Sequence, residues 1–338
     1  MMAVTLKQIA DSAGVSTATV SRFMNADPSL SITQKTREKI IKAIEDLGYD
    51  KQPRAISIPR NIALLDTTEP TDLVQDEYFD TVRESVAEFS RTHNLTLTTF
   101  TTLKDILKNA KKVDGFIGIG PRTLTDRELT RLHSALPHGV FIDTNPAPHL
   151  FDSVQPDLQQ TIVDAIDILT RSGKKKIAFI GGDDASPDTH HRKELRSRTF
   201  IEYATSCGLD ITNLVYDKGP FCVETGKTLT EQLIANHKEA MPDAIIVAAD
   251  SLAVGVLQSL AAAHIAVPHD VAVVSINNMP IAQYMSVPLT TYDIDIHELT
   301  NMAVTLLTQA ISRKRERTAH AHIGTKLVVR SSFVPERI

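Results

Sequence analysis

The most informative absences in this sequence concern tryptophan, cysteine and long apolar runs. Its 338 residues include no Trp, and aromatic residues make up 5%, which argues against an extended base-stacking surface for single-stranded nucleic acid. Two cysteines, Cys207 and Cys222, cannot build a disulfide framework or a four-ligand zinc site, and we expect unpaired thiols in a reducing compartment. The uncharged stretch Ser251–His269 contains Pro268 and predicts a buried helix and a turn, not a membrane span.

Targeting and catalytic signals are missing as well. The N-terminus carries acidic and polar residues where a signal peptide needs an apolar core, so we expect a cytoplasmic protein. No G-x-S-x-G or H-E-x-x-H pattern occurs, and Gly118–Pro121 lacks the glycine spacing of a phosphate loop. The pair His190 and His191 has the wrong spacing for a metal site. The sequence therefore predicts no catalytic residue, no metal site and no cofactor.

What is present describes a globular protein with an uneven charge distribution. Hydrophobic residues make up 42% and charged residues 23%, and the length suggests two or three folded units. The net charge is −5, but residues 1–60 hold nine Lys/Arg against six Asp/Glu, a balance of +3. The remainder holds 27 against 35, a balance of −8. A basic head on an acidic body suggests that the head meets a polyanion.

The first 48 residues predict three short helices around a small core. Thr5 and Gln8 form a capping box, Gly14 ends the first helix, and Ser16 and Thr33 are placed to cap the second and third. The apolar positions that follow from this arrangement are Ile9, Ala10, Ala13, Val15, Val20, Phe23, Ile40, Ile41, Ile44 and Leu47.

The second of these helices has the chemistry of a recognition helix. Small polar residues at its start let backbone N–H groups approach a phosphate. Thr17, Ala18 and Arg22 lie on one face, where Arg22 can contact guanine O6 and N7 in the major groove. A plain helical hairpin with a solvated arginine remains the alternative on these residues alone.

Beyond residues 50–60, which carry two prolines and read as a linker, strands and helices alternate. This alternation predicts an α/β body with parallel sheets in two lobes and a ligand cleft at the carboxyl ends of the strands. The strands are expected at 62–66, 95–100, 116–119, 140–143, 177–180, 213–216, 244–248 and 271–276. The helices are expected at 79–92, 126–135, 159–171, 196–206, 224–236 and 252–263.

Motifs along nearly the whole chain resemble the LacI/GalR family of bacterial transcription regulators. The resemblance starts at Thr5–Arg22 (TLKQIADSAGVSTATVSR) and continues in the body at Ala178–Gly182, Ala249–Gly255 and Pro288–Thr291. It implies a helix-turn-helix head at 1–49, a hinge at 50–60 and a two-lobed periplasmic-binding-protein-like body at 61–338. The first lobe is then expected at about 61–157 and 290–318, and the second at about 160–288 and 323–332.

The resemblance also assigns the DNA-contacting positions. Thr17 and Ala18 match variable base-reading positions, and Arg22 matches a base-contacting arginine. Ala55 and Ile58 match the hinge helix that wedges an apolar side chain into the minor groove, although Ile replaces the usual Leu and Pro59 follows at once; an unstructured linker is the alternative. Positions expected to face phosphate or backbone are Thr5, Leu6, Ser16, Thr19, Ser21, Asn25, Thr33 and Thr36.

For the effector cleft, the resemblance implies a set of polar residues around aromatic faces, which suits a neutral sugar. The set is Tyr78, Asp143, Arg196, Phe221, Asp250 and Asn277. Each has a simpler alternative: Arg196 as an interlobe salt bridge, Asp250 as a helix cap, Phe221 as core. Lysine and arginine near residues 192–198 leave a sugar phosphate open.

Three function classes follow. The leading hypothesis is a homodimeric repressor that binds double-stranded operator DNA and is released by galactose or a galactoside. Phe141–Pro146 and Asn277 resemble galactose-operon and evolved-β-galactosidase-type repressors within the family. A phosphorylated-sugar effector or a phosphoprotein corepressor is the alternative. A sugar-binding protein without a DNA role, and an α/β enzyme, are the other classes. The chain has no C-terminal heptad run, so a dimer is expected rather than a tetramer built on a helical tail.

Overall fold

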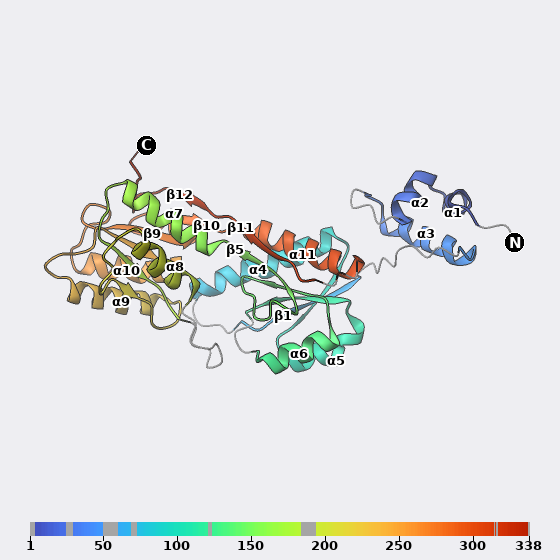
Figure 1. Ribbon diagram of the computed structural model, residues 1–338, viewed down its shortest axis with the longest axis horizontal. Coiled ribbons are helices and arrows are strands. Elements are labelled where there is room, and N and C mark those ends of the chain that lie inside the picture. The colour runs from blue at the N-terminus through green and yellow to red at the C-terminus, as the bar shows by residue number, and fades with distance from the viewer. Residues whose placement is uncertain are drawn as a thin grey trace.

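The computed structural model describes residues 4–24, 30–49, 60–68, 73–120, 124–183, 194–313, 315 and 317–336. Its N-terminal head is made of three helices, α1 (Leu6–Ala13), α2 (Thr17–Met24) and α3 (Gln34–Asp46) (Figure 1). The apolar faces of these helices meet in a core of Ile9, Ala10, Ala13, Val20, Phe23, Ile40, Ala43 and Ile44. The head therefore has the three-helix arrangement that the sequence predicts.

The predicted caps of the head helices are present. Thr5 and the side chain of Gln8 form a reciprocal capping box, and Gly14 ends α1 with φ of 68°. The hydroxyl of Ser16 accepts a hydrogen bond from the Thr19 N–H at 3.0 Å, and Thr33 caps α3 in the same way. These caps satisfy backbone donors that a helix start leaves without partners.

The body contains two six-stranded sheets. In the first, the strand order is β11-β5-β4-β3-β1-β2, and every pair is parallel. Its strands are β1 (Asn61–Asp66), β2 (Thr96–Phe100), β3 (Gly115–Ile119), β4 (Gly139–Ile142), β5 (Asp152–Pro156) and β11 (His320–Ile323). Its helices are α4 (Leu73–Thr92), α5 (Leu103–Asn109), α6 (Asp126–Ala135) and α11 (Ile296–Arg313), with a 3-10 turn η1 at Ala110–Lys112.

The second sheet has the order β12-β10-β9-β8-β6-β7, in which only the β10–β12 pair is antiparallel. Its strands are β6 (Ile177–Ile180), β7 (Val215–Tyr216), β8 (Ala244–Val247), β9 (Ala272–Asn277), β10 (Thr290–Asp293) and β12 (Lys326–Val328). Its helices are α7 (Leu158–Arg171), α8 (Leu195–Ser206), α9 (Val223–Asn236) and α10 (Asp250–Ala262), with a 3-10 turn η2 at Pro280–Gln283.

Each sheet is buried on both faces, which explains its continuous apolar strands. In the first lobe α4 and α11 pack together on one face, and α5 and α6 lie on the other (Figure 1). Alternate residues of β1 accordingly enter different clusters, with Ile62 and Leu64 on the α4 side and Ala63 and Leu65 on the α5 side. The structure confirms the predicted α/β body of two lobes with parallel sheets.

The chain passes between the lobes three times, after β5, after β10 and after β11. The first and third passages are hydrogen-bonded to each other, since the Asp157 N–H donates to the Ile323 carbonyl at 2.8 Å. The predicted lobe boundaries need two corrections. β10, placed by the sequence in the first lobe, pairs with β9 of the second, and β11 extends the first lobe to residue 323. Pairing between distant strands, which a local pattern does not encode, decides both.

Candidate effector cleft and nucleic-acid interface

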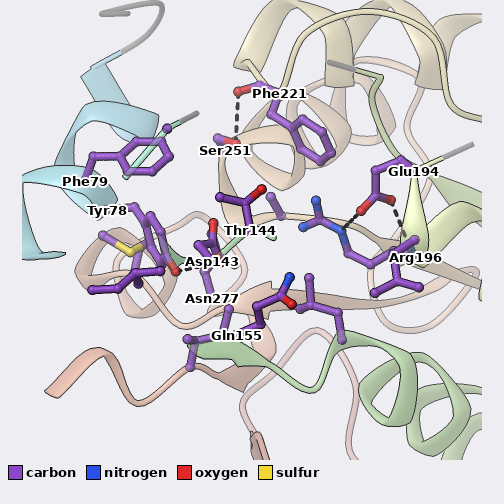
Figure 2. Close-up of a pocket in the computed structure, with 17 residues that line it drawn as sticks. Tyr78, Phe79, Asp143, Thr144, Gln155, Glu194, Arg196, Phe221, Ser251 and Asn277 are labelled. Carbon is purple, nitrogen blue, oxygen red and sulfur yellow. Dashed lines mark hydrogen bonds and ion pairs between the residues drawn. The ribbon is translucent and has the colours of Figure 1, made fainter. Parts of the chain in front are cut away.

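A cavity of about 250 Å³ lies between the lobes at the carboxyl ends of the strands. Elements of both lobes line it: α4 and the segments after β3 and β4 from the first, and α8, α10 and the end of β9 from the second. Its lining residues are Tyr78, Phe79, Gly120, Ile142, Asp143, Thr144, Gln155, Leu158, Glu194, Leu195, Arg196, Phe221, Ala249, Ser251, Asn277, Met279 and Ile294 (Figure 2).

The first-lobe wall is built on a contact between Tyr78 and Asp143. The Tyr78 hydroxyl donates a hydrogen bond to Asp143 Oδ1 at 3.2 Å, and Asp143 takes a left-handed φ of 68° directly after β4. Burial raises the pKa of Tyr78, and the neighbouring Asp143 carboxylate raises it further, so the phenol stays protonated. The ring of Phe79 meets that of Tyr78 edge to face, with centroids 5.3 Å apart. The wall thus offers a carboxylate beside an aromatic surface.

The second-lobe wall is centred on Arg196 in the first turn of α8. Its Nε donates to Glu194 Oε1 at 2.8 Å, and its Nη1 donates to the Ala248 carbonyl at 2.7 Å. The guanidinium also lies over the ring of Phe221, 4.6 Å from the centroid. Several partners therefore fix this side chain where its planar set of donors faces the cavity (Figure 2).

Asn277 contributes a neutral amide at the end of β9. Its φ of 114° lies in a region that L-residues rarely adopt, and the next residue, Asn278, also has a positive φ of 55°. The side chain of Asn278 turns away from the cavity lining, donating to Asp293 and accepting from Arg330, both at 2.7 Å. Because of these two backbone conformations, Asn277 lines the cavity whereas the adjacent Asn278 bonds to structural neighbours.

Asp250 does not line the cavity, which corrects its predicted placement in the cleft. The side chain is fully buried and accepts hydrogen bonds from the Met279 N–H at 2.8 Å and the Thr291 hydroxyl at 2.9 Å. Burial raises its pKa to about 6, although these hydrogen bonds oppose the shift. Its neighbours Ala249 and Ser251 line the cavity instead, because α10 begins at residue 250 and turns the carboxyl group inward.

Sequence reasoning missed several polar residues of the lining. Gln155 is the penultimate residue of β5, a strand that was not among those predicted. Glu194 lies two residues before Arg196 and caps α8, a role that the spacing of an acid before a helix could have indicated. Thr144 and Ser251 follow predicted residues directly in the chain. The Ser251 hydroxyl donates to the Phe221 carbonyl at 3.3 Å and so supports the aromatic wall.

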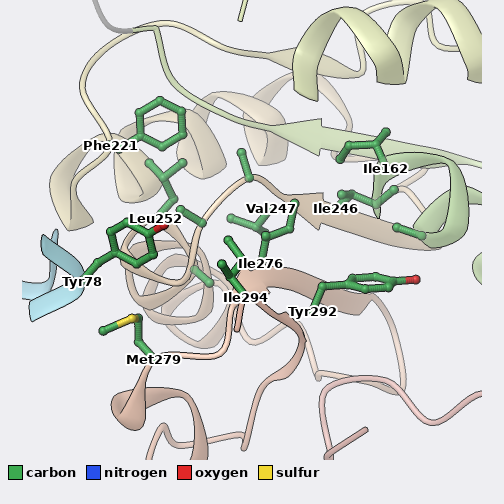
Figure 3. Close-up of a cluster of buried hydrophobic side chains, with 14 of the residues drawn as sticks. Tyr78, Ile162, Phe221, Ile246, Val247, Leu252, Ile276, Met279, Tyr292 and Ile294 are labelled. Atoms are coloured by element: carbon green, nitrogen blue, oxygen red, sulfur yellow. The ribbon is translucent and has the colours of Figure 1, made fainter. Parts of the chain in front are cut away.

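The floor of the cavity is continuous with the hydrophobic core. Tyr78, Phe221, Met279 and Ile294 each belong to the large cluster that also fills the second sheet (Figure 3). Apolar surface of this kind binds the C–H faces of a ring, while the surrounding amides, carboxylates and guanidinium bond its hydroxyls. Asp143 and Glu194 place negative charge beside Arg196. The cleft therefore suits a neutral polyhydroxyl compound better than an anion; residues 192 and 193 lie outside the described part of the chain.

The predicted base-reading residues share an exposed surface of the head. Thr17, Ala18 and Arg22 are all exposed on α2, with Val20 and Phe23 buried behind them. Thr17 and Ala18 are too small for extensive hydrogen bonding to bases, so of these three side chains only Arg22 has the donors for a bidentate contact to a base. Helix α2 thus has one exposed face, which is what a helix needs in order to enter a major groove.

The positions expected to face the DNA backbone divide into three groups. Exposed at helix starts are Thr5, Ser16 and Thr33, and half-buried are Leu6, Thr19, Ser21 and Thr36. Hydroxyl pairs join Ser16 to Thr19 and Thr33 to Thr36, each at 2.8 Å, so these side chains serve as caps. Leu6 also packs against the head core. Asn25, Ala55 and Ile58 lie outside the described residues.

Metal binding and membrane insertion would each need a further structural feature. In the described ranges, no group of three or more His, Cys, Asp or Glu residues is placed to hold a metal ion. None of the helices described is both long and apolar enough to cross a membrane. Cys207 and Cys222 are free thiols, as the sequence predicts.

Comparison with known proteins matches both parts of the chain. Residues 5–52 match the model of bacterial regulatory proteins of the lacI family, and residues 166–333 match a periplasmic binding protein-like domain. The chain is 41% identical to the HTH-type transcriptional regulator LacR of Lactobacillus helveticus, covering 98% of this chain and 99% of that protein. It is 39% identical to the regulator GanR of Bacillus subtilis, covering 97% and 99%.

Solved structures share the fold. The cellobiose complex of the transcriptional regulator CelR aligns with a TM-score of 0.66 at 24% identity, covering 98% of this chain and 100% of that one. The lac repressor dimer bound to operator and an anti-inducer aligns with a TM-score of 0.65 at 21% identity, covering 98% and 99%. The arrangement of head and two-lobed body is therefore a known one.

Proposed function

Because the chain belongs to the lacI family of bacterial regulatory proteins, which are DNA-binding transcription regulators, we propose that it represses a sugar-utilisation operon and is released by galactose or a galactoside. The observation that carries the sugar proposal is the cleft itself. Tyr78 and Asp143 of one lobe face Arg196 and Phe221 of the other across a cavity of about 250 Å³. A ring bound there contacts both lobes and favours their closure.

The proposal assigns one task to each part of the chain. Residues 1–49 bind the operator, residues 50–60 form the hinge, and residues 61–338 bind the effector and a second copy of the chain. Two copies present two α2 helices to a two-fold symmetric operator. It follows that the protein works in the cytoplasm, where an operator is accessible, and that it needs no catalytic residue or cofactor.

Release requires the sugar to bind the two conformations of the protein differently. In the proposed mechanism, closure of the cleft shifts the packing of the first lobes in the dimer and disfavours the hinge helices. A coupling free energy of about 1–3 kcal/mol is typical of such systems and corresponds to about a 5- to 150-fold change in operator affinity. Two related solved structures contain a sugar: the regulator CelR is bound to cellobiose, and a LacI family regulator from Lactobacillus casei is bound to sucrose.

The test is selection of duplexes from a random pool by the full-length protein, with and without galactose. Enrichment of a palindrome that galactose abolishes supports operator binding, dimer symmetry and induction together. A palindrome that galactose does not affect keeps the repressor but contradicts this effector. Stronger operator binding with galactose contradicts the inducer role, and turnover of galactose would instead support an enzyme.

A matched pair of variants tests the recognition surface. Arg22→Ala removes the guanidinium from the exposed face of α2, whereas Lys35→Ala removes an exposed charge from α3. Loss of a bidentate guanine contact costs about 1–3 kcal/mol, so we expect about 5- to 150-fold weaker binding of the selected duplex by Arg22→Ala. Fluorescence anisotropy measures both affinities. An equal loss of duplex affinity in the two variants would mean that Arg22 contributes only a general attraction between charges.

A further inference from the structure

A second cavity, of about 240 Å³, lies at the amino-terminal ends of the strands of the first sheet, opposite the carboxyl ends that face the effector cleft. Gly139 and Asp152, which begin β4 and β5, line it, whereas Asp143 and Gln155 of the cleft lie at the far ends of the same strands. Because the sheet is parallel, this edge is also where Asn61 begins β1. We call this cavity the basal pocket.

The side chains of the basal pocket are rich in cationic and imidazole groups. Its charged and imidazole side chains are His133, His138, His149, Asp152, Arg315 and Arg317. The Asp152 carboxylate does not leave its oxygens open to a ligand. One oxygen accepts from the Ala319 N–H at 2.8 Å, and the other accepts from Arg315 Nη2. Arg317 and the imidazoles thus add to an ion pair that is already complete.

Two buried nitrogen atoms of this pocket have no hydrogen-bond partner in the described structure. They are His133 Nδ1 and Arg315 Nε, half of the four such side-chain atoms found in the described residues. An arginine Nε always carries a proton, so its burial without an acceptor is unfavourable. The ring of His133 is held edge to face against Phe151, with centroids 5.3 Å apart. Both atoms have almost no accessible surface, so they show that the pocket wall is rich in donors, but they are not themselves the atoms that meet a ligand.

The occupant that suits this pocket is an anion with several acceptor oxygens, because the exposed side chains of Arg317 and His149 line the cavity beside the Arg315–Asp152 pair. Arginine pairs with phosphate through two parallel hydrogen bonds, and imidazole N–H groups donate to the remaining oxygens. A cavity of this volume admits a phosphate group with a small organic substituent, and it is far too narrow for a duplex. The cleft between the lobes differs, because Asp143 and Glu194 supply acceptors there.

We propose that the basal pocket is a second ligand site, which binds a small phosphate-bearing anion independently of the sugar in the cleft. This site lies on the edge of the first lobe at which the chain arrives from the linker. The linker to the DNA-binding head starts from this side of the body. An anion bound in the pocket would therefore change the electrostatic potential near the start of the linker. The proposal does not depend on which sugar fills the cleft.

The first experiment is calorimetric titration of the full-length protein with inorganic phosphate and, separately, with galactose 6-phosphate at fixed ionic strength. We expect saturable binding at one site per chain. Equal affinities indicate that the phosphate group alone is recognised, and tighter binding of the ester indicates contacts to its organic part; both support the site. Absence of saturable binding by either compound overturns it.

Variants locate the binding. His149 and Arg317 are exposed, so the double variant His149→Gln/Arg317→Gln keeps the buried Arg315–Asp152 pair and is expected to fold. We expect at least a tenfold loss of phosphate affinity in this variant. A second variant, His133→Phe, keeps the ring against Phe151 but removes its nitrogen atoms, and we expect weaker phosphate binding by this variant also.

A matched control separates a local effect from general charge. Arg131→Gln removes an exposed charge from α6, the same helix as His133, outside the pocket lining, and should leave phosphate affinity within twofold. Binding that survives the double variant but disappears in Arg196→Gln belongs to the cleft and overturns the proposal. If the double variant instead loses operator affinity while binding of both phosphate compounds is unchanged, these residues contact DNA and the proposal is wrong.

Discussion

At the scale of single residues, Arg196 joins the cleft to the structure behind it. One side of its guanidinium is bonded to Glu194 and to the Ala248 carbonyl, and its face covers Phe221. Such a side chain is fixed before a ligand arrives, so little conformational entropy is lost when a sugar hydroxyl accepts its N–H groups. Lysine at this position would keep the charge but not the planar set of donors.

We therefore predict that Arg196→Lys binds galactose at least tenfold more weakly than the wild type. Arg198→Lys is the matched control, because Arg198 lies one half-turn further along α8 and is exposed. Calorimetric titration of both variants measures the affinities, and thermal unfolding checks that both are folded. Similar affinities in the two variants would show that the contact is a general charge effect.

A second residue-scale prediction concerns Asp250, whose pKa burial raises to about 6. A carboxyl group with a folded-state pKa above its unfolded value of 3.8 binds more protons when folded, so it makes stability fall as pH rises through this interval. From pH 4.5 to 7.5 the wild type should lose about 2 kcal/mol of unfolding free energy relative to Asp250→Asn. Urea unfolding of both proteins across this range measures the difference. A difference that does not change with pH would contradict the prediction.

At the scale of elements, α9 and α10 approach each other closely at two glycines. A Cβ atom on Gly226 would lie 2.1 Å from the Leu252 carbonyl oxygen, and one on Gly255 would lie 2.1 Å from that of Val223. In each case the obstacle is backbone, which cannot turn aside as a side chain does. The contact of these two helices therefore depends on the absence of a side chain at both positions.

Alanine at either glycine should push the helices apart. We predict that Gly255→Ala lowers the free energy of unfolding by about 1–3 kcal/mol, as overpacking of a close-packed interior typically does. Gly324→Ala serves as the control, because its Cβ would meet no atom within 4 Å. Chemical denaturation compares the two, and an equal, small effect in both would mean that the helices can shift without cost.

The elements also show how far local pattern predicts this fold. Strands such as β6 (IAFI) and β8 (AIIV) were predicted correctly because continuous β-branched and apolar residues mark a strand buried on both faces. In contrast, β5 (DSVQP), β11 (HAHI) and β12 (KLV) were not predicted. Asp and Pro disfavour strands in isolation, and the last two lie at sheet edges, where none of their residues is fully buried. Pairing with distant partners decides these segments.

The same limit applies to the cleft. Family resemblance predicted the placement of Tyr78, Asp143, Arg196, Phe221 and Asn277, all of which line the cavity. The resemblance misplaced Asp250, the first residue of α10. A one-residue shift at a helix start turns a side chain from the cavity into the core. The basal pocket was not predicted at all, since its residues come from 133–152 and 310–318, two distant parts of the sequence that only the tertiary structure brings together.

At the scale of the whole molecule, the proposed repressor acts as a pair of chains. One chain has a mass of 37.1 kDa and presents a single α2 helix, which reads half of a palindrome. In the proposed mechanism, a sugar that closes both bodies changes the spacing of two heads at once. Symmetry would then convert a small movement within each chain into a mismatch with the operator.

We predict that two chains bind one duplex of the selected palindrome. Light scattering of the complex should give the mass of the duplex plus about twice that of one chain, at concentrations well above the dissociation constant. Galactose should return the DNA and the protein to separate peaks while the protein remains a pair. A complex with one chain per duplex would contradict the symmetric arrangement.

The positions of β11 and β12 have a consequence for synthesis. Both sheets receive an outermost strand from the last twenty residues of the chain, β11 beside β5 and β12 beside β10. A ribosome makes β11 and β12 after β5 and β10, so the hydrogen-bonding edges of β5 and β10 stay open until these later strands have been made. Exposed edges of this kind recruit strands from neighbouring nascent chains. Pairing of β11 and β12 therefore closes two sheet edges that are open to such contacts until these strands have been made.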